Sequence, residues 1–133
     1  MSTTKTILVV EDEVDETSYL TALFEDHGFA VVSASNGQEG FEKAKSQHPD
    51  LITLDISMPE ESGVRMFRDL QDDPATADIP VVIITGITHE FKRFIETRKQ
   101  VRPPAGYFDK PPARDELIAK INEILGAKAG RPN

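Results

Sequence analysis

The sequence predicts an α/β fold in which helices cover both faces of a doubly wound parallel sheet. Short apolar segments with the character of β-strands alternate with amphipathic segments along the chain, and this alternation is typical of such a sheet. The connections are short, so right-handed crossovers would bring the strands into one sheet. With 133 residues, the chain is long enough for one domain with a buried core and too short for two full domains.

The first half of the chain contains three of the expected strands. The run from Ile7 to Val10 is continuously apolar, as expected of a strand that is buried on both faces. Gly28 is a C-terminal stop for the first helix, and Pro49 ends the second helix, which begins after the turn at Asn36. We therefore expect strands at 7–10, 29–33 and 51–55, and helices at 14–27 and 38–47.

The second half continues the alternation. Ser62 is a suitable N-cap for a third helix, whereas Ala113 is a poor N-cap for the last one. The last helix has a clear apolar face that contains Leu117, Ile121 and Leu125. We expect strands at 81–84 and 106–108 and helices at 63–71 and 88–98. The segment 127–133 is rich in small residues and is expected to be a flexible tail.

Composition excludes several classes of protein. The net charge of -8 argues against a nucleic-acid-binding surface, which requires a basic face. The chain has no cysteine, so disulfide scaffolds, thiolate metal sites and cysteine nucleophiles are excluded. No apolar run approaches the length of a membrane span, and the N-terminal segment does not resemble a signal peptide. We therefore expect a cytoplasmic protein that contacts no membrane.

Polar side chains lie at or just after the ends of four expected strands. Glu11 and Asp12 follow the first strand, Asp55 ends the third, and Thr85 and Lys110 follow the fourth and fifth. These ends meet at one edge of a parallel sheet, where functional sites of such folds form. Three carboxylates brought together repel one another unless a cation is bound, and an all-oxygen set favours Mg²⁺.

The same group of residues suits phosphoryl chemistry. Lys110 and Thr85 can donate hydrogen bonds to phosphoryl oxygens, and a carboxylate such as Asp55 can accept a phosphoryl group as an aspartyl phosphate. Taken one at a time, these residues also have ordinary structural interpretations. Acidic residues after a strand often cap the next helix, and an aromatic residue such as Tyr107 on a short strand is usually part of the core.

Motifs around these residues resemble the receiver domain of bacterial two-component response regulators, of the stand-alone, CheY-like kind. The resemblance covers about residues 5 to 125. It implies a (βα)5 flavodoxin-like fold with strand order 2-1-3-4-5, a receiver domain at 1–126 and no output domain. The motifs are Ile-Leu-Val-Val-Glu11-Asp12-Glu13, Leu54-Asp55-Ile56-Ser57-Met58-Pro59 with Gly63 behind it, Ile-Pro80-Val-Val-Ile-Ile-Thr85-Gly86, and Tyr107-Phe108-Asp109-Lys110-Pro111.

The resemblance assigns a metal site and a phosphoacceptor. It implies that Asp55 accepts a phosphoryl group from the phosphohistidine of a sensor histidine kinase or a histidine phosphotransferase. Asp12, Asp55 and the backbone carbonyl of Ser57 would bind Mg²⁺ directly, and Glu11 would bind it through water. Lys110 would contact a phosphoryl oxygen and help to keep Asp55 ionised.

The resemblance also implies a switch and a mode of output. Thr85 would move toward the phosphoryl group and vacate space into which Tyr107 rotates. The expected output is binding of a protein target through the face formed by the fourth helix, fifth strand and fifth helix, without nucleic acid. The protein would catalyse its own phosphorylation and dephosphorylation and would not be an ordinary turnover enzyme.

Three alternatives remain open. A phosphatase of the haloacid dehalogenase type needs a second Asp two residues after the nucleophile, where this chain has Ser57. A flavodoxin-like FMN module would meet repulsion from Glu11, Asp12 and Glu13 after the first strand. A degenerate receiver would act as an interaction module that needs no phosphorylation.

Two regions depart from the family pattern. Glu60 and Glu61 follow Pro59 where many receivers have Gly, and they add negative charge beside the site. The segment between Thr85 and Lys110 is longer than usual, which predicts an irregular fourth helix and a changed partner surface.

Overall fold

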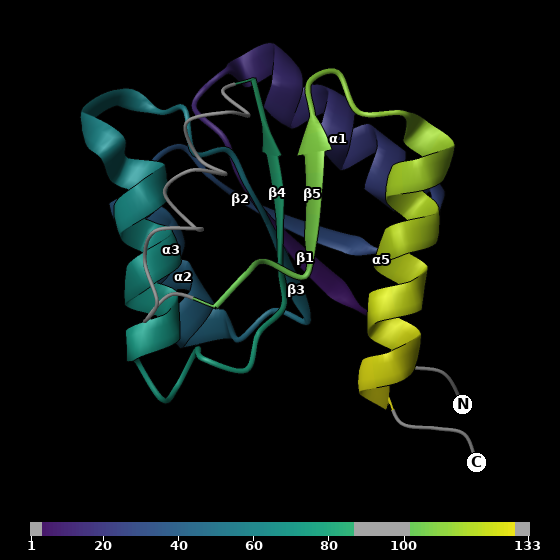
Figure 1. Ribbon diagram of the computed structural model, residues 1–133. Helices are drawn as coiled ribbons and strands as arrows, with labels where there is room; N and C mark the ends of the chain where they lie inside the picture. The colour runs from purple at the N-terminus through teal and green to yellow at the C-terminus, as the bar shows by residue number, and fades with distance from the viewer. Residues whose placement is uncertain (1–3, 87–101, 130–133) are drawn as a thin grey trace.

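A five-stranded parallel sheet forms the centre of the protein (Figure 1). The computed structural model describes residues 4–86 and 102–129, so the helix expected at 88–98 lies outside the described residues. The strand order is β2-β1-β3-β4-β5, and every neighbouring pair is parallel. The predicted doubly wound α/β fold and its strand order are therefore confirmed.

The elements lie close to their predicted positions. The strands are β1 (Thr6–Val10), β2 (Ala30–Ala34), β3 (Leu51–Leu54), β4 (Val81–Thr85) and β5 (Gly106–Asp109). The helices are α1 (Val14–Asp26), α2 (Gly37–Gln47), α3 (Ser62–Asp72) and α5 (Arg114–Ala129), and a 3₁₀ turn, η1 (Pro59–Glu61), precedes α3.

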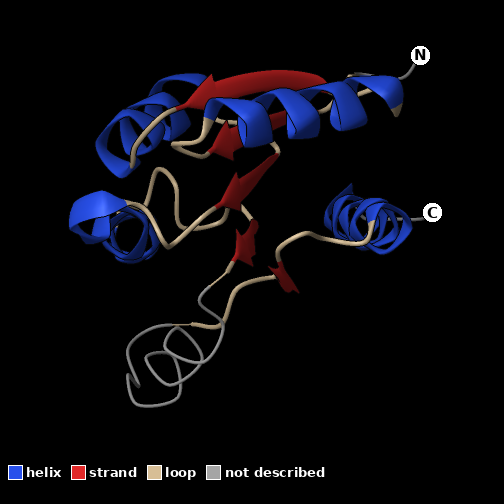
Figure 2. Cartoon of the chain, turned by 90° about the horizontal axis from the view of Figure 1, so that it is seen from above, coloured by secondary structure: helices blue, strands red, loops and turns tan. Residues whose placement is uncertain are grey.

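Alternating strand residues divide the core into two layers. Leu8, Ile52 and Ile83 face α2 and α3, whereas Ile7 and Val82 face α1 and α5. Figure 2 shows the helices on both sides of the strands. Because successive side chains of a strand point to opposite faces, continuously apolar strands such as β1 and β4 can fill both layers at once.

Three details differ from the sequence-based expectations. Ser62 is the first residue of α3 and not its N-cap, because η1 joins the helix there, and its hydroxyl accepts the N–H of Gly37 at 3.2 Å. Thr85 is the last residue of β4 and does not follow the strand. The last helix continues to Ala129, so residues 127–129 of the expected tail are helical, and residues 130–133 lie outside the described part.

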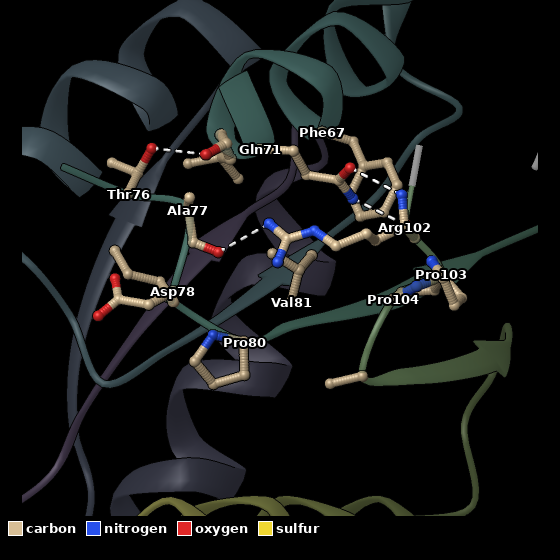
Figure 3. A pocket seen from close by; sticks show the side chains of 13 residues that line it. Phe67, Gln71, Thr76, Ala77, Asp78, Pro80, Val81, Arg102, Pro103 and Pro104 are labelled. Carbon is tan, nitrogen blue, oxygen red and sulfur yellow. Dashed lines mark hydrogen bonds between the residues drawn. The ribbon is translucent and has the colours of Figure 1, made fainter. Parts of the chain in front are cut away.

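The segment before β5 is hydrogen-bonded to the C-terminal end of α3 (Figure 3). The Gln71 side-chain amide donates to the Arg102 carbonyl and accepts the Arg102 N–H, both at 2.8 Å. The Arg102 guanidinium donates to the Ala77 carbonyl at 3.0 Å. A cavity of about 250 Å³ lies between this segment and Pro80. These contacts hold the segment that leads into the N-terminal end of β5. The expected site lies at the other end of the strands, where they terminate.

Close packing of backbones positions the loop after β3. A Cβ atom on Gly63 would overlap the carbonyl oxygen of Asp55 and would approach the Cα atom of Ile56 to 2.6 Å. Gly63 is therefore required by the contact between the first turn of α3 and this loop, and not by an unusual backbone angle. The same contact holds Asp55 at the carboxyl end of β3.

We expect Gly63→Ala to lower the free energy of unfolding by about 2 kcal/mol, because the added methyl group must displace backbone atoms. Gly126→Ala is the matched control. Apart from the backbone of its own helix, no atom of the described residues lies within 4 Å of a methyl group added at this position of α5, so this change should raise stability by about 0.5 kcal/mol through helix propensity. Urea denaturation of both variants measures the difference, and equal stability of the two would contradict this packing account.

Candidate functional site

Three carboxylates meet at the carboxyl ends of β1 and β3. Backbone hydrogen bonds carry the ladder past the strand ends, from the Glu11 N–H to the Ala34 carbonyl at 3.0 Å and from the Asp55 N–H to the Val10 carbonyl at 3.1 Å. Oxygen atoms of Glu11, Asp12 and Asp55 lie within 4.8 Å of one another. Glu11 and Asp55 are each 3% exposed, whereas Asp12 is exposed. The topology thus concentrates negative charge at one point.

Lys110 reaches this point from the end of β5. Its ammonium lies 3.0 Å from Asp55 Oδ2, 3.0 Å from Glu11 Oε1 and 3.7 Å from Glu13 Oε1. The Lys110 N–H donates to the Thr85 carbonyl at 3.0 Å, which anchors the backbone beside β4. The side chain is only 20% exposed, so its charge is shared among three carboxylates with little help from solvent.

The other oxygen of Asp55 is held by Ser57. The Ser57 N–H donates to Asp55 Oδ1 at 2.9 Å, and the Ser57 hydroxyl donates to the same oxygen at 2.7 Å. With Lys110 on Oδ2, both oxygens of this buried carboxylate are engaged. Hydrogen bonds to an ionised acceptor are the strong kind, so the carboxylate has a defined orientation.

The environment shifts the pKa values of Glu11, Asp55 and Lys110 from their usual values. Burial raises the pKa of Glu11 to about 7, with a further contribution from the neighbouring Asp55 charge. Burial opposes ionisation of Asp55 too, but the hydrogen bonds from Ser57 and Lys110 outweigh it, and its pKa lies below the usual value. Burial likewise opposes the charge of Lys110, yet its bonds to Glu11 and Asp55 raise its pKa. Of the two buried carboxylates, Asp55 is therefore the one that is ionised more readily.

Thr85 and Tyr107 lie on the same face of the sheet. Tyr107 pairs with Ile83, and Asp109 pairs with Thr85, so Tyr107 and Thr85 are diagonal neighbours on adjacent strands. Thr85 is completely buried, and Tyr107 is half-buried against the core layer under α2 and α3. Diagonal neighbours on one face can influence each other's position directly.

The carboxylates fit a hard divalent cation. The cluster offers oxygen ligands alone, and Asp12 opens it to solvent, so an ion has a path of entry. The three carboxylates outnumber the single ammonium of Lys110, which pairs with Glu11 and Asp55, so the cluster keeps an excess of negative charge. Oxygen donors with excess negative charge are the preferred environment of Mg²⁺. The structure thus brings together Glu11, Asp12, Asp55, Ser57 and Lys110, with Thr85 bonded to Lys110 through its carbonyl.

Two features of the site were not predicted from the sequence. Glu13 lies close enough to Lys110 for an ion pair, although it is 69% exposed. It is the N-cap residue of α1, but its side chain makes no capping hydrogen bond, so the helix-cap interpretation does not hold for it. The hydrogen bond from the Ser57 hydroxyl to Asp55 was not predicted either. A serine two residues after an aspartate at a strand end is close enough to make such a bond, and this spacing could have indicated it.

Comparison with known proteins gives a consistent result. The family model described as "Response regulator receiver domain" matches residues 7–122. The protein PilH of Pseudomonas aeruginosa is 36% identical over 119 residues, which cover 90% of this chain and 96% of PilH. The polar-differentiation response regulator DivK of Brucella ovis is 31% identical over 123 residues, which cover 92% of this chain and 98% of DivK.

A solved structure has the same fold. The receiver domain of a sensor histidine kinase from Pseudomonas aeruginosa PAO1 aligns with a TM-score of 0.80 at 23% identity, covering 92% of this chain and 98% of that one. That structure holds a magnesium ion in its active-site cleft.

We expect Lys110→Met to destabilise the protein in a pH-dependent manner. Without the ammonium, the pKa of Asp55 in the folded state rises, and the pKa of Glu11, which is already above its usual value, rises further. The resulting cost is present at high pH and disappears as both groups are protonated. The free energy of unfolding should fall by about 3 kcal/mol at pH 8 and by clearly less at pH 5.

The control is Lys120→Met, which removes an exposed pair with Glu123 and should cost less than about 1 kcal/mol at either pH. Urea denaturation at the two pH values measures both variants. An equal loss for Lys110→Met at pH 5 and pH 8 would show that the buried charges do not control this site.

Proposed function

The chain belongs to the response regulator receiver domain family of two-component signalling, and we propose that Asp55 is its phosphoacceptor. The observation that carries this assignment is the environment of the Asp55 carboxylate. It is buried and ionised, it lies beside two further carboxylates, and one of its oxygens is bonded to Lys110. An ionised, oriented carboxylate at the opening of the sheet edge is suited to attack phosphorus.

The chain's own residues supply positioning and charge. In phosphoryl transfer an oxygen of Asp55 forms the bond to phosphorus while the bond to the donor nitrogen breaks, and that nitrogen leaves with a proton. Lys110 faces the oxygen of Asp55 and is placed to contact a phosphoryl oxygen as negative charge moves onto the site. Little covalent work is required of the protein, so orientation accounts for most of the catalysis.

Glu11, Asp12, Asp55 and the Ser57 backbone carbonyl are the groups that we assign to Mg²⁺, with Glu11 acting through water. When bound, the ion neutralises negative charge on the carboxylates and on the phosphoryl oxygens. The oxygen-only carboxylate cluster supports this assignment. The residues also favour a hard cation over a soft one, because the cluster contains no histidine and the chain contains no cysteine.

We assign the switch to Thr85 and Tyr107. Thr85 ends β4 beside Lys110, and Tyr107 is its diagonal neighbour on β5. A shift of the Thr85 hydroxyl toward a phosphoryl group would open space on the face of the sheet that Tyr107 shares. The proposed output face combines β5, α5 and the helix expected at 88–98, and residues 88–98 lie outside the described part of the chain. The output partner is a protein target, and the donor is a sensor histidine kinase or a histidine phosphotransferase.

The reaction is self-catalysed phosphorylation and dephosphorylation of one residue, so we do not class the protein as a turnover enzyme. We place its action in the cytoplasm, without contact to nucleic acid or membrane. Within the described ranges, no helix has the length and apolar character required to cross a membrane.

Intact mass spectrometry tests the proposed function directly. Incubation with Mg²⁺ and phosphoramidate should add one phosphoryl group to the wild type and none to Asp55→Asn. Asp26→Asn, an exposed change at the far end of α1, is the control and should be phosphorylated like the wild type. Failure of the wild type to gain mass would favour a degenerate receiver, and turnover of free phosphoesters would favour the phosphatase alternative.

Mg²⁺ binding should depend on pH through Glu11. Because the pKa of Glu11 is about 7 and the ion requires ionised carboxylates, the apparent affinity should rise about tenfold between pH 6 and pH 8, with release of a proton. Calorimetry in buffers of different ionisation enthalpy measures both quantities. Glu11→Gln should bind more weakly and lose the pH dependence. A wild-type affinity that stays constant over this range would contradict the role of Glu11.

A further inference from the structure

Some acidic side chains near Asp55 have no role in the proposed phosphoryl transfer or in Mg²⁺ binding. Among the described residues, Lys110 is the cation paired with Asp55, and the same ammonium also contacts Glu11 and Glu13. Glu13 is 69% exposed, so its carboxylate stands at the entrance and not inside the site. An incoming anion therefore meets a cation whose charge three carboxylates already share.

Glu60 is a second exposed carboxylate, and it lines a groove that also contains the site residue Asp12. A groove of about 510 Å³ runs from Asp12 along the N-terminal ends of α2 and α3, and Glu60 lines it. Arg65 is the cation in the described lining, and Asp12, Glu60 and Asp69 outnumber it. The backbone of Glu60 is left-handed, with φ 58° and ψ 25°, a conformation that glycine adopts more easily. A charged residue thus occupies a position that glycine would fill with less strain.

We propose that Glu13 and Glu60 make the phosphoacceptor site discriminate among phosphodonors by their charge. The proposal rests on the proposed function, since it concerns transfer to Asp55. Both carboxylates repel a dianionic small donor, and neither contacts Asp55 in the way that Lys110 and Ser57 do. The donor class that they disfavour is the dianionic acyl phosphate, because a donor whose nitrogen is protonated carries less negative charge.

Two small donors separate this effect from general reactivity. With acetyl phosphate, the Asp55 oxygen bonds to phosphorus, the bridging phosphorus–oxygen bond breaks, and acetate leaves with the electron pair. With phosphoramidate, the phosphorus–nitrogen bond breaks, and the nitrogen takes a proton and leaves as ammonia. The acceptor chemistry is the same, but acetyl phosphate carries more negative charge at neutral pH.

The test measures the rate of phosphorylation with each donor in saturating Mg²⁺ and at several salt concentrations. Glu13→Gln and Glu60→Gln should each raise the acetyl phosphate rate by about threefold, as expected for a unit charge acting across several ångströms of water. The phosphoramidate rate should change by less than about twofold. The wild-type acetyl phosphate rate should increase with salt, because salt screens the repulsion, and this increase should be smaller in the double variant.

Glu25→Gln, an exposed change near the far end of α1, is the matched control and should change neither rate. Glu60→Gly removes the charge together with the left-handed strain and should accelerate acetyl phosphate as Glu60→Gln does. Unchanged acetyl phosphate rates and salt dependence in both Glu60 variants and in Glu13→Gln would overturn the proposal while leaving the phosphoacceptor assignment intact. If neither donor phosphorylated the wild type, the proposed function itself would fail.

Discussion

The Lys110 ammonium between Asp55 and Glu11 is the interaction on which the site depends. Three charged groups are withdrawn from water at one edge of the sheet, and each alone would be costly to bury. The two ion pairs of Lys110, each 3.0 Å long, offset part of the free-energy cost of burying these charges. One ammonium between two carboxylates still leaves an excess of negative charge. The excess suits the cluster to a divalent cation. Burial is the main cause of the raised pKa of Glu11, and the hydrogen bonds from Ser57 and Lys110 define the orientation of Asp55.

The fold brings together the residues of this interaction, which are far apart in the chain. Glu11 follows β1, Asp55 follows β3 and Lys110 follows β5, and the strand order places β3 next to β1 with β4 between β3 and β5. Continuously apolar strands hold these ends in register because they are packed on both faces. The contact of Gly63 with the Asp55 carbonyl and the bond from Lys110 to Thr85 then fix the loops at the atomic level. The rigidity of the scaffold explains how a single ammonium can reach two buried carboxylates at once.

The sequence predicted the architecture and the main members of the site because both follow from simple patterns. Periodicity located the strands within one or two residues, and the rule that parallel strand ends converge brought Glu11, Asp12, Asp55, Thr85 and Lys110 to one edge. The sequence patterns could not predict the conformations of the loops. Ser62 was expected to cap α3, but η1 extends the helix backward and turns the Ser62 hydroxyl toward Gly37. The ion pair of Glu13 and the hydroxyl bond of Ser57 depend on side-chain rotamers, which have no periodic signal in a sequence.

The most direct test of the central claim is a crystal structure of the protein with Mg²⁺ and beryllium fluoride, a stable mimic of a phosphoryl group. We expect the beryllium to be bonded to an oxygen of Asp55, with the Lys110 ammonium against a fluorine and the metal on Asp12. Beryllium fluoride bonded to a different carboxylate, or Lys110 remaining on Glu11 without contact to the mimic, would contradict the account.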